Sequence, residues 1–296
     1  MRRLLLILSL CSNLLAASLW AQDEVVPRPV TSVITMGIGQ GAMRDTYLAP
    51  LLYRGTELSV RYERWRLMRQ CRWNNQQSVD VRLSEGTNKS GLSDALTGRL
   101  TYRYAMHRVL GLGPVSAEGH PFTLSAGAYA GADLGFDYNL RMAGSNNPAT
   151  ARAAAHVGAS AMAAWHYSLR RQPCVLSLQL QSPLLGMAFV PEYGASYFET
   201  FYLNHTDRDV HFTSLHNQQD LDVRLTTDVP VSVIPWFRGL DTTLRLGVAC
   251  HVETMDINDI ITRFSTCEFV IGWTYQYLPM SRRKSNLLKS APAYAY

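Results

Sequence analysis

The chain has 296 residues, of which 47% are hydrophobic and 17% are charged. That length accommodates one large β-domain or two domains of ordinary size. The formal net charge is +5. Without Arg2 and Arg3, 26 basic residues face 23 acidic ones, and this bias is too weak to indicate a nucleic-acid-binding protein.

The first residues are typical of a secretory signal. Met1-Arg2-Arg3 is followed by an apolar run, Leu4 to Leu10, and by small residues up to Ala21. We therefore expect a signal peptide that is cleaved after Ala21. A lipoprotein signal at Cys11 is the alternative, and it is disfavoured because Leu10 is large for the position before a lipidated cysteine. No later segment has the roughly 20 apolar residues that a transmembrane helix needs.

Alternation with period two dominates the rest of the chain. From Phe122 to Asn139 every second residue is apolar or small, and the residues between them are mostly polar or glycine. A strand separates these two sets onto opposite faces, whereas a helix would mix them. Residues 151–170 repeat the pattern with many alanines, and the strict alternation outweighs the helix preference of alanine.

We therefore predict an all-β fold, an antiparallel up-and-down transmembrane β-barrel of about ten strands, with 8–12 possible. The barrel takes residues 30–278, after a signal peptide (1–21) and a short segment (22–29), and before a periplasmic tail (279–296). The predicted strands are 30–41, 53–69, 73–84, 95–107, 121–139, 151–170, 174–190, 209–228, 242–255 and 262–278.

Alternation alone fits two arrangements. In a soluble barrel or sandwich the apolar face is the core, whereas in a membrane barrel it meets lipid and the polar face lines the interior. Aromatic residues favour the membrane, because Phe122 lies at one end of its strand and Phe136 and Tyr138 lie at the other. Such positions match the two interfaces of a bilayer. The connections alternate between short turns and longer polar loops, although two of the predicted periplasmic connections are long.

The last predicted strand carries a pattern similar to the signal that the outer-membrane insertion machinery reads. Gly272 is followed by aromatic residues three and five positions later, Tyr275 and Tyr277. Val270 departs from the polar residue usual at the start of that signal, and the tail places the signal inside the chain. We expect the barrel insertion machinery and outer-membrane lipid as partners.

Three runs resemble segments of an outer-membrane family of the Bacteroidetes, domain of unknown function 3316 (DUF3316). They are Asp45 to Leu51, Gly55 to Trp65, and His211 to Gln218. The resemblance extends from about Thr31 to Leu278. It implies a membrane barrel in the outer membrane of a Gram-negative bacterium, from an anaerobic source. It implies no activity and supplies no catalytic residues.

The polar face of the predicted strands carries charges of both signs. Lysine is confined to Lys89, Lys284 and Lys289, so nearly all positive charge is arginine, which pairs well with carboxylates. A ten-stranded barrel is narrow enough for side chains to fill. We interpret these residues as a charge-paired interior, with a narrow polar conduit as the alternative. They are Arg61, Glu63, Arg99, Arg103, Asp133, Asp137, Arg152, His156, Arg245, His251 and Glu253, with Glu57, Asp222, Arg224 and Glu268.

A second polar group lies near the start of the predicted strand 209–228. It comprises His205, Asp207, His211, Ser214 and His216. A histidine oriented by a carboxylate can act as a general base for a serine nucleophile. Loops and strand ends are polar in any barrel, so we rank these residues as weak catalytic candidates. No GxSxG, HExxH or Walker motif occurs.

Four cysteines follow the predicted signal: Cys71, Cys174, Cys250 and Cys267. They form no CxxC pair and have no zinc spacing, so we expect no metal and no cofactor. A turn centred between Asn258 and Asp259 would place Cys250 directly opposite Cys267, on the lipid-facing side. We expect both to be free thiols, because a bridge adds little to an already paired ladder.

The sequence favours a structural, binding or narrow-transport barrel over an enzyme. The alternative is an outer-membrane hydrolase acting on lipid or peptide at the cell surface. Nothing in the sequence indicates a particular ligand or oligomeric state, and nothing indicates nucleic-acid binding.

Overall fold

A computed structural model describes residues 30–68, 73–112, 121–140, 147–170, 172–192, 194, 209–233 and 242–277. The predicted signal peptide, the segment 22–29, the tail 279–296 and Cys71 lie outside the described residues. No helix among these residues is long and apolar enough to cross a membrane.

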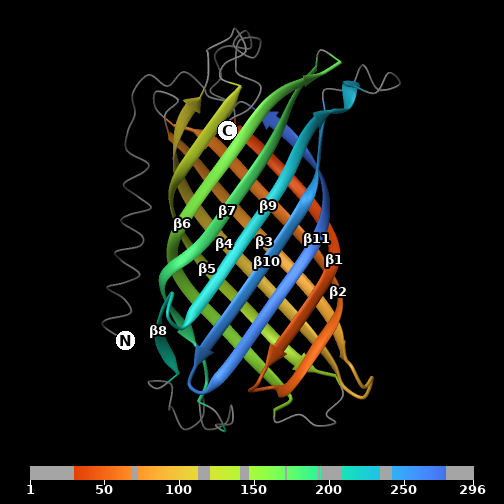
Figure 1. Cartoon of the computed structure of the whole chain (residues 1–296), viewed down its shortest axis with the longest axis vertical. Helices are drawn as coiled ribbons and strands as arrows, with labels where there is room; N and C mark the ends of the chain where they lie inside the picture. The colour runs from red at the N-terminus through yellow and green to blue at the C-terminus, as the bar shows by residue number, and fades with distance from the viewer. Residues whose placement is uncertain are drawn as a thin grey trace.

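The chain forms a closed antiparallel barrel whose strands tilt steeply around a common axis (Figure 1). Ten strands close the wall in chain order, with β1 pairing with both β2 and β11 and β6 pairing with β7. The predicted ten-stranded up-and-down barrel is confirmed, and most strands are longer than predicted. They are β1 (Val30–Asp45), β2 (Ala49–Leu67), β3 (Trp73–Asn88), β4 (Asp94–Leu112), β5 (Phe122–Asn139), β6 (Ala149–Leu169), β7 (Gln172–Phe189), β9 (Gln218–Pro230), β10 (Thr243–Ile257) and β11 (Ile260–Tyr277).

The barrel has two distinct ends. The connections β1–β2, β3–β4, β5–β6 and β10–β11 lie at one end, which we call the hairpin end and which is at the bottom of Figure 1. Val30 and Tyr277, the first and last strand residues, pair with each other at the opposite end, which we call the terminal end.

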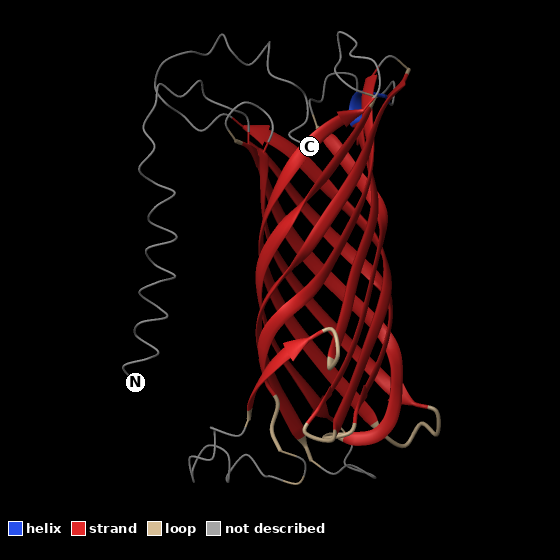
Figure 2. Ribbon diagram, turned by 60° about the vertical axis from the view of Figure 1, so that its left-hand side comes forward, coloured by secondary structure: helices blue, strands red, loops and turns tan. Residues whose placement is uncertain are grey.

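The predicted strand 209–228 is wrong as a single element. It is divided into β8 (Val210–Ser214) and β9, joined by a turn at residues 215–217. β9 pairs with β7 only as far as Gln181, and β8 takes the same edge of β7 from Leu185 to Phe189. Pro183 lies between these two pairings, and as proline it has no N–H for the ladder. The interruption leaves β8 as a short arm beside the wall at the hairpin end (Figure 2).

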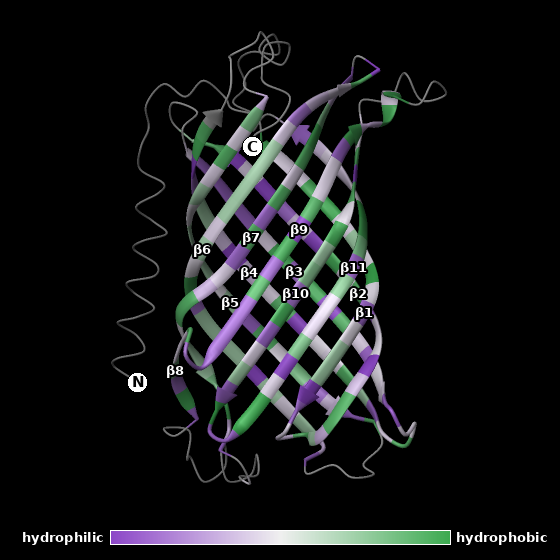
Figure 3. Cartoon of the chain, in the orientation of Figure 1, coloured by the Kyte–Doolittle hydropathy of each residue, from purple (hydrophilic) through white to green (hydrophobic). Residues whose placement is uncertain are grey.

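The two faces of the wall are chemically opposite. On β5, Leu124 and Leu134 are 44% and 55% exposed on the outside, whereas Ser125 and Asp137 are buried inside. Hydrophobic and hydrophilic bands alternate in the same way along the other strands (Figure 3). Aromatic rings on the outside stack near the terminal end, with Phe122 and Trp165 6.0 Å apart. A polar interior and an apolar exterior are the inverse of a soluble barrel and match a barrel surrounded by lipid.

The last hairpin confirms the predicted register. Asn258 and Asp259 form its turn with φ angles of 56° and 60°, the left-handed pair that a tight two-residue hairpin requires. Cys250 lies directly opposite Cys267, and both are on the outer face. The expectation of free thiols is wrong for this pair, because the two cysteines form a disulfide. Their Cα atoms are 4.1 Å apart, which is a close cross-strand pair within bonding reach of two sulfur atoms.

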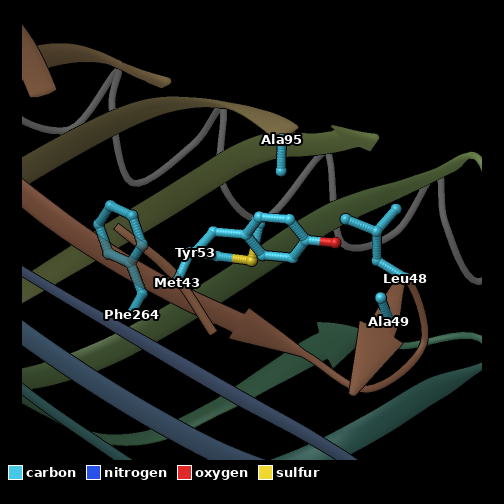
Figure 4. Packing of buried hydrophobic residues seen from close by; sticks show 6 residues of the cluster. All are labelled: Met43, Leu48, Ala49, Tyr53, Ala95 and Phe264. Carbon is cyan, nitrogen blue, oxygen red and sulfur yellow. The ribbon is translucent and has the colours of Figure 1, made fainter. Parts of the chain in front are cut away.

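An apolar plug closes the hairpin end of the lumen. The β1–β2 turn, residues 46–48, folds inward, so that Tyr47 and Leu48 are at most 1% exposed. Leu48 belongs to a cluster of six buried residues, in which Tyr53 and Met43 lie between Leu48 and Phe264 (Figure 4). Tyr47 packs with residues of β7, β10 and β11 in a second cluster. Asn147 ties the turn down by donating its side-chain N–H to the Tyr47 carbonyl at 3.0 Å.

Candidate functional site in the barrel lumen

Charged side chains cross the middle of the lumen. Arg245 donates to Glu63 at 2.9 Å and to Asp228 at 2.7 Å, so it joins β10 to β2 and β9. Arg103 of β4 reaches Asp222 of β9 at 3.0 Å. The Arg245–Asp228 pair joins neighbouring strands, whereas Arg245–Glu63 and Arg103–Asp222 join strands that are not neighbours in the wall, so these two pairs span the interior. We call the set the ion-pair belt: Arg61, Glu63, Asp80, Arg82, Arg103, Asp222, Arg224, Asp228 and Arg245.

The local sequence explains why these side chains point inward. Asp80 and Arg82 alternate with Val79, Val81 and Leu83, so the pleat that exposes the three apolar residues buries the two charges. Each belt side chain is at most 9% exposed, and each has at least one partner of opposite charge. Such a network is tolerated away from bulk water because the charges compensate one another.

A polar chamber lies between the belt and the plug. Its volume is about 60 Å³, and its lining includes Arg82 and Arg103 of the belt and Met255 and Phe264 of the apolar clusters. That volume holds a few water molecules or a ligand of a few heavy atoms. The polar lining residues beyond the belt are Arg99, Thr101, Asp133, Arg152, Gln218, Asp220, His251 and Glu253.

Two histidine–aspartate pairs are the most distinctive groups at the chamber. His156 Nδ1 lies 3.1 Å from Asp133, and His251 Nδ1 lies 3.3 Å from Asp220. Neither Nδ1 atom makes a hydrogen bond of good geometry among the described residues, so the two pairs are close contacts between an imidazole and a carboxylate. His251, Asp133 and Asp220 line the chamber, and His156 lies behind Asp133.

The predicted interior residues fall into three groups. The structure places Arg61, Glu63, Arg103, Asp222, Arg224 and Arg245 in the belt. Arg99, Asp133, Arg152, His251 and Glu253 line the chamber, where Arg99 pairs with Asp137 at 3.0 Å, Asp133 with His156 at 3.1 Å and Arg152 with Glu253 at 3.4 Å. Glu57 and Glu268 are buried and belong to neither region. The sequence reasoning missed Asp80, Arg82, Asp220 and Asp228. Asp220 and Asp228 have the same inward parity on β9 as Asp222 and Arg224, which it selected. Asp80 and Arg82 lie on β3, where it selected no residue, although their alternation with Val79, Val81 and Leu83 was the signal for them.

Of the rim candidates, the structure describes His211, Ser214 and His216, and these three do not all meet at one point. The Ser214 hydroxyl contacts His216 Nδ1 in an exposed position. His211 instead lies 2.8 Å from the side-chain nitrogen of Asn258 in the β10–β11 turn. His205 and Asp207 lie outside the described residues. Within the described part of the chain, no carboxylate is paired with His216, and no group of three metal-binding side chains occurs.

The proposed assembly signal lies on β11 near the terminal end. Tyr275 and Tyr277 stack on the outer face with ring centroids 6.2 Å apart. Gly272 faces inward and lies opposite Thr35 of β1, where the main chains approach closely.

Solved outer-membrane barrels resemble this structure at low sequence identity. The outer membrane protease OmpT from Escherichia coli is 8% identical with a TM-score of 0.49, over 87% of this chain and 99% of that one. The translocator domain of autotransporter NalP from Neisseria meningitidis is 8% identical with a TM-score of 0.41, over 91% and 95%. The attachment invasion locus protein Ail of Yersinia pestis is 11% identical with a TM-score of 0.28, over 83% and 98%. These likenesses concern the fold alone.

A search of curated proteins found no match. The family model described as "Protein of unknown function (DUF3316)" matches residues 3–284. Because this match covers nearly the whole sequence, the chain belongs to the DUF3316 family.

Proposed function

We propose that this protein is a non-conducting outer-membrane barrel with a structural or ligand-binding role, and that the chamber is its binding site. The observation that carries the proposal is the ion-pair belt. Arginines and carboxylates from strands that are not neighbours meet across the lumen at 2.9–3.4 Å, and these contacts would interrupt a continuous path for ions along the belt. Belt residues line the chamber on one side, and Met255 and Phe264 of the apolar clusters line it on the other.

The chamber chemistry indicates the class of ligand. Arg82 and Arg103 are held by belt carboxylates, and Arg99 is paired with Asp137. The chamber lining has four arginines and four carboxylates, so its charges balance: Arg82, Arg99, Arg103 and Arg152 against Asp80, Asp133, Asp220 and Glu253. A small polar molecule with hydrogen-bonding groups is the ligand that fits this lining and volume.

Localisation follows from the same features. The protein would reside in the outer membrane of a Gram-negative bacterium, of the Bacteroidetes if the sequence resemblance extends to the source. The hairpin end would face outward and the terminal end would face the periplasm. Outer-membrane lipid would contact the apolar exterior, and the insertion machinery would engage Gly272, Tyr275 and Tyr277 on β11.

Conductance tests the closed lumen directly. The purified barrel, inserted into a planar lipid bilayer, should show no steady current, because ions would have to pass both the ion-pair belt and the apolar plug. Folding is verified on the same sample by its heat-dependent migration on a detergent gel, and insertion by co-flotation of the barrel with lipid vesicles that are then fused to the bilayer. Discrete, reproducible conductance steps from folded protein would overturn the proposal in favour of a narrow channel.

A surface hydrolase is the second candidate, and the Ser214–His216 contact is the observation that favours it. Labelled phospholipid and peptide substrates should be hydrolysed no faster with folded barrel than without it, because the described residues provide no carboxylate to orient His216. The comparison uses wild type, His216→Ala and Ser90→Ala, an exposed serine in another connection. Hydrolysis that is lost in His216→Ala and retained in Ser90→Ala would establish the hydrolase.

A further inference from the structure

Two carboxylates and one guanidinium group meet at one wall of the chamber. Glu253 of β10 lies directly opposite Asp220 of β9, and both side chains line the chamber. Arg152, which also lines it, belongs to β6, a strand that does not adjoin β10 in the wall. Its Nη1 lies 3.4 Å from Glu253 Oε2. Directly opposed residues have Cβ atoms about 4.5–5.5 Å apart, so Asp220 and Arg152 both adjoin Glu253.

This group leaves one buried atom of each kind unmatched. Among the described residues, Asp220 Oδ1 and Arg152 Nη2 have no hydrogen-bond partner of good geometry. The Asp220 side chain is 6% exposed, and its contact with His251 Nδ1 at 3.3 Å lacks the geometry of a hydrogen bond. The Arg152 side chain is 13% exposed. A buried acceptor and a buried donor are both costly to leave without partners.

The two unmatched atoms call for opposite charges on one ligand. Asp220 Oδ1 suits a positively charged donor, and Arg152 Nη2 suits a carboxylate, which guanidinium groups bind well. Because the chamber lining balances arginines against carboxylates, a ligand with a net charge would upset that balance, whereas a ligand with both charges preserves it. The volume of about 60 Å³ limits the ligand to a few heavy atoms.

From this arrangement we infer that the chamber binds a small zwitterion, namely an α-amino acid of the size of glycine or alanine. The ammonium group of the ligand donates to Asp220, and its carboxylate accepts from Arg152, with Glu253 between the two partners. The inference rests on the proposed role of the chamber as a binding site, and it adds the charge pattern of the ligand.

Equilibrium dialysis of radiolabelled glycine against the folded barrel tests this ligand class. The protein is refolded into a non-ionic detergent in the presence of glycine, so that binding does not depend on a route past the belt or the plug. We expect one site with a dissociation constant on the order of 10⁻³ M, within the range open to so small a ligand. Acetate, methylammonium and acetamide, which carry one charge or none, should compete at least about tenfold more weakly.

Asp220→Asn and Arg152→Gln should each weaken glycine binding about tenfold or more, because each removes the charge that one end of the ligand requires. Glu85→Gln and Arg54→Gln are the matched controls, since they remove one carboxylate and one guanidinium group at exposed positions of the outer face. Both controls should bind glycine as wild type does. Heat-dependent migration confirms the folding of each variant, and if Arg152→Gln does not fold, Asp220→Asn alone decides the result.

The competitors separate the ligand class from the role of the chamber. If acetate, methylammonium or acetamide binds as tightly as glycine and Asp220→Asn weakens that binding, the zwitterion is overturned and the chamber remains a binding site. If Asp220→Asn binds glycine as tightly as Glu85→Gln, glycine binds elsewhere and the inference is overturned. If none of the four compounds binds, both the inference and the proposed role of the chamber as a binding site are overturned.

Discussion

Glu63→Ala is expected to lower the free energy of unfolding by about 3–5 kcal/mol, the range for removing one partner from a buried charge network. Glu63 forms an ion pair with Arg61 at 3.0 Å, accepts from Arg224 at 3.2 Å and from Arg245 at 2.9 Å, and accepts from Trp65 at 3.3 Å. The substitution therefore leaves three buried guanidinium groups short of negative charge. Asp228 still holds Arg245, so the barrel should fold with reduced stability.

The measurement is reversible denaturant unfolding in lipid vesicles, followed by tryptophan fluorescence. Glu85→Ala serves as the control, because Glu85 is exposed on the outer face and has no role in the belt. Its cost should stay within about 0.5 kcal/mol, as for most surface substitutions. Similar costs for the two variants would show that the belt does not stabilise the barrel.

The sequence predicted the wall well because the wall obeys a local rule. Alternation alone places Asp137 inside and Leu134 outside, whatever the strands pair with. Hairpin arithmetic likewise predicted that Cys250 lies opposite Cys267, since a two-residue turn fixes the register. Each of these features depends on residues that are close in sequence or joined by one short turn.

The contacts inside the lumen depend on tertiary structure and not on local sequence. Which arginine meets which carboxylate depends on barrel closure and on the stagger of the strands, which bring Arg245 of β10 to Glu63 of β2. No local pattern encodes that contact. The inward fold of residues 46–48 is also tertiary, because Tyr47 and Leu48 find apolar partners on strands from the rest of the barrel. The chamber between belt and plug was therefore not predictable from alternation.

Ala128→Arg is expected to cost about 2–4 kcal/mol in a bilayer, the range for arginine on the lipid face near the midplane. Ala128 is exposed on the outer face of β5, between the aromatic positions Phe122 and Phe136 that mark the two interfaces. The new guanidinium would lie in hydrocarbon unless it bent toward an interface. Reversible unfolding in liposomes measures the cost.

The control must place an arginine on the opposite face. Alternation alone suggests Gly127→Ser as an inward substitution with a small effect on stability. The structure rules it out as a control, because a side chain at Gly127 would collide with the main-chain carbonyl of Met106. Thr101→Arg is a better control, because it introduces the same residue on the inner face. Thr101 lines the chamber opposite Asp133, so the added charge remains in the polar lumen beside a carboxylate. Its cost should be clearly smaller than that of Ala128→Arg, and a larger cost would mean that the lipid and lumen faces are exchanged.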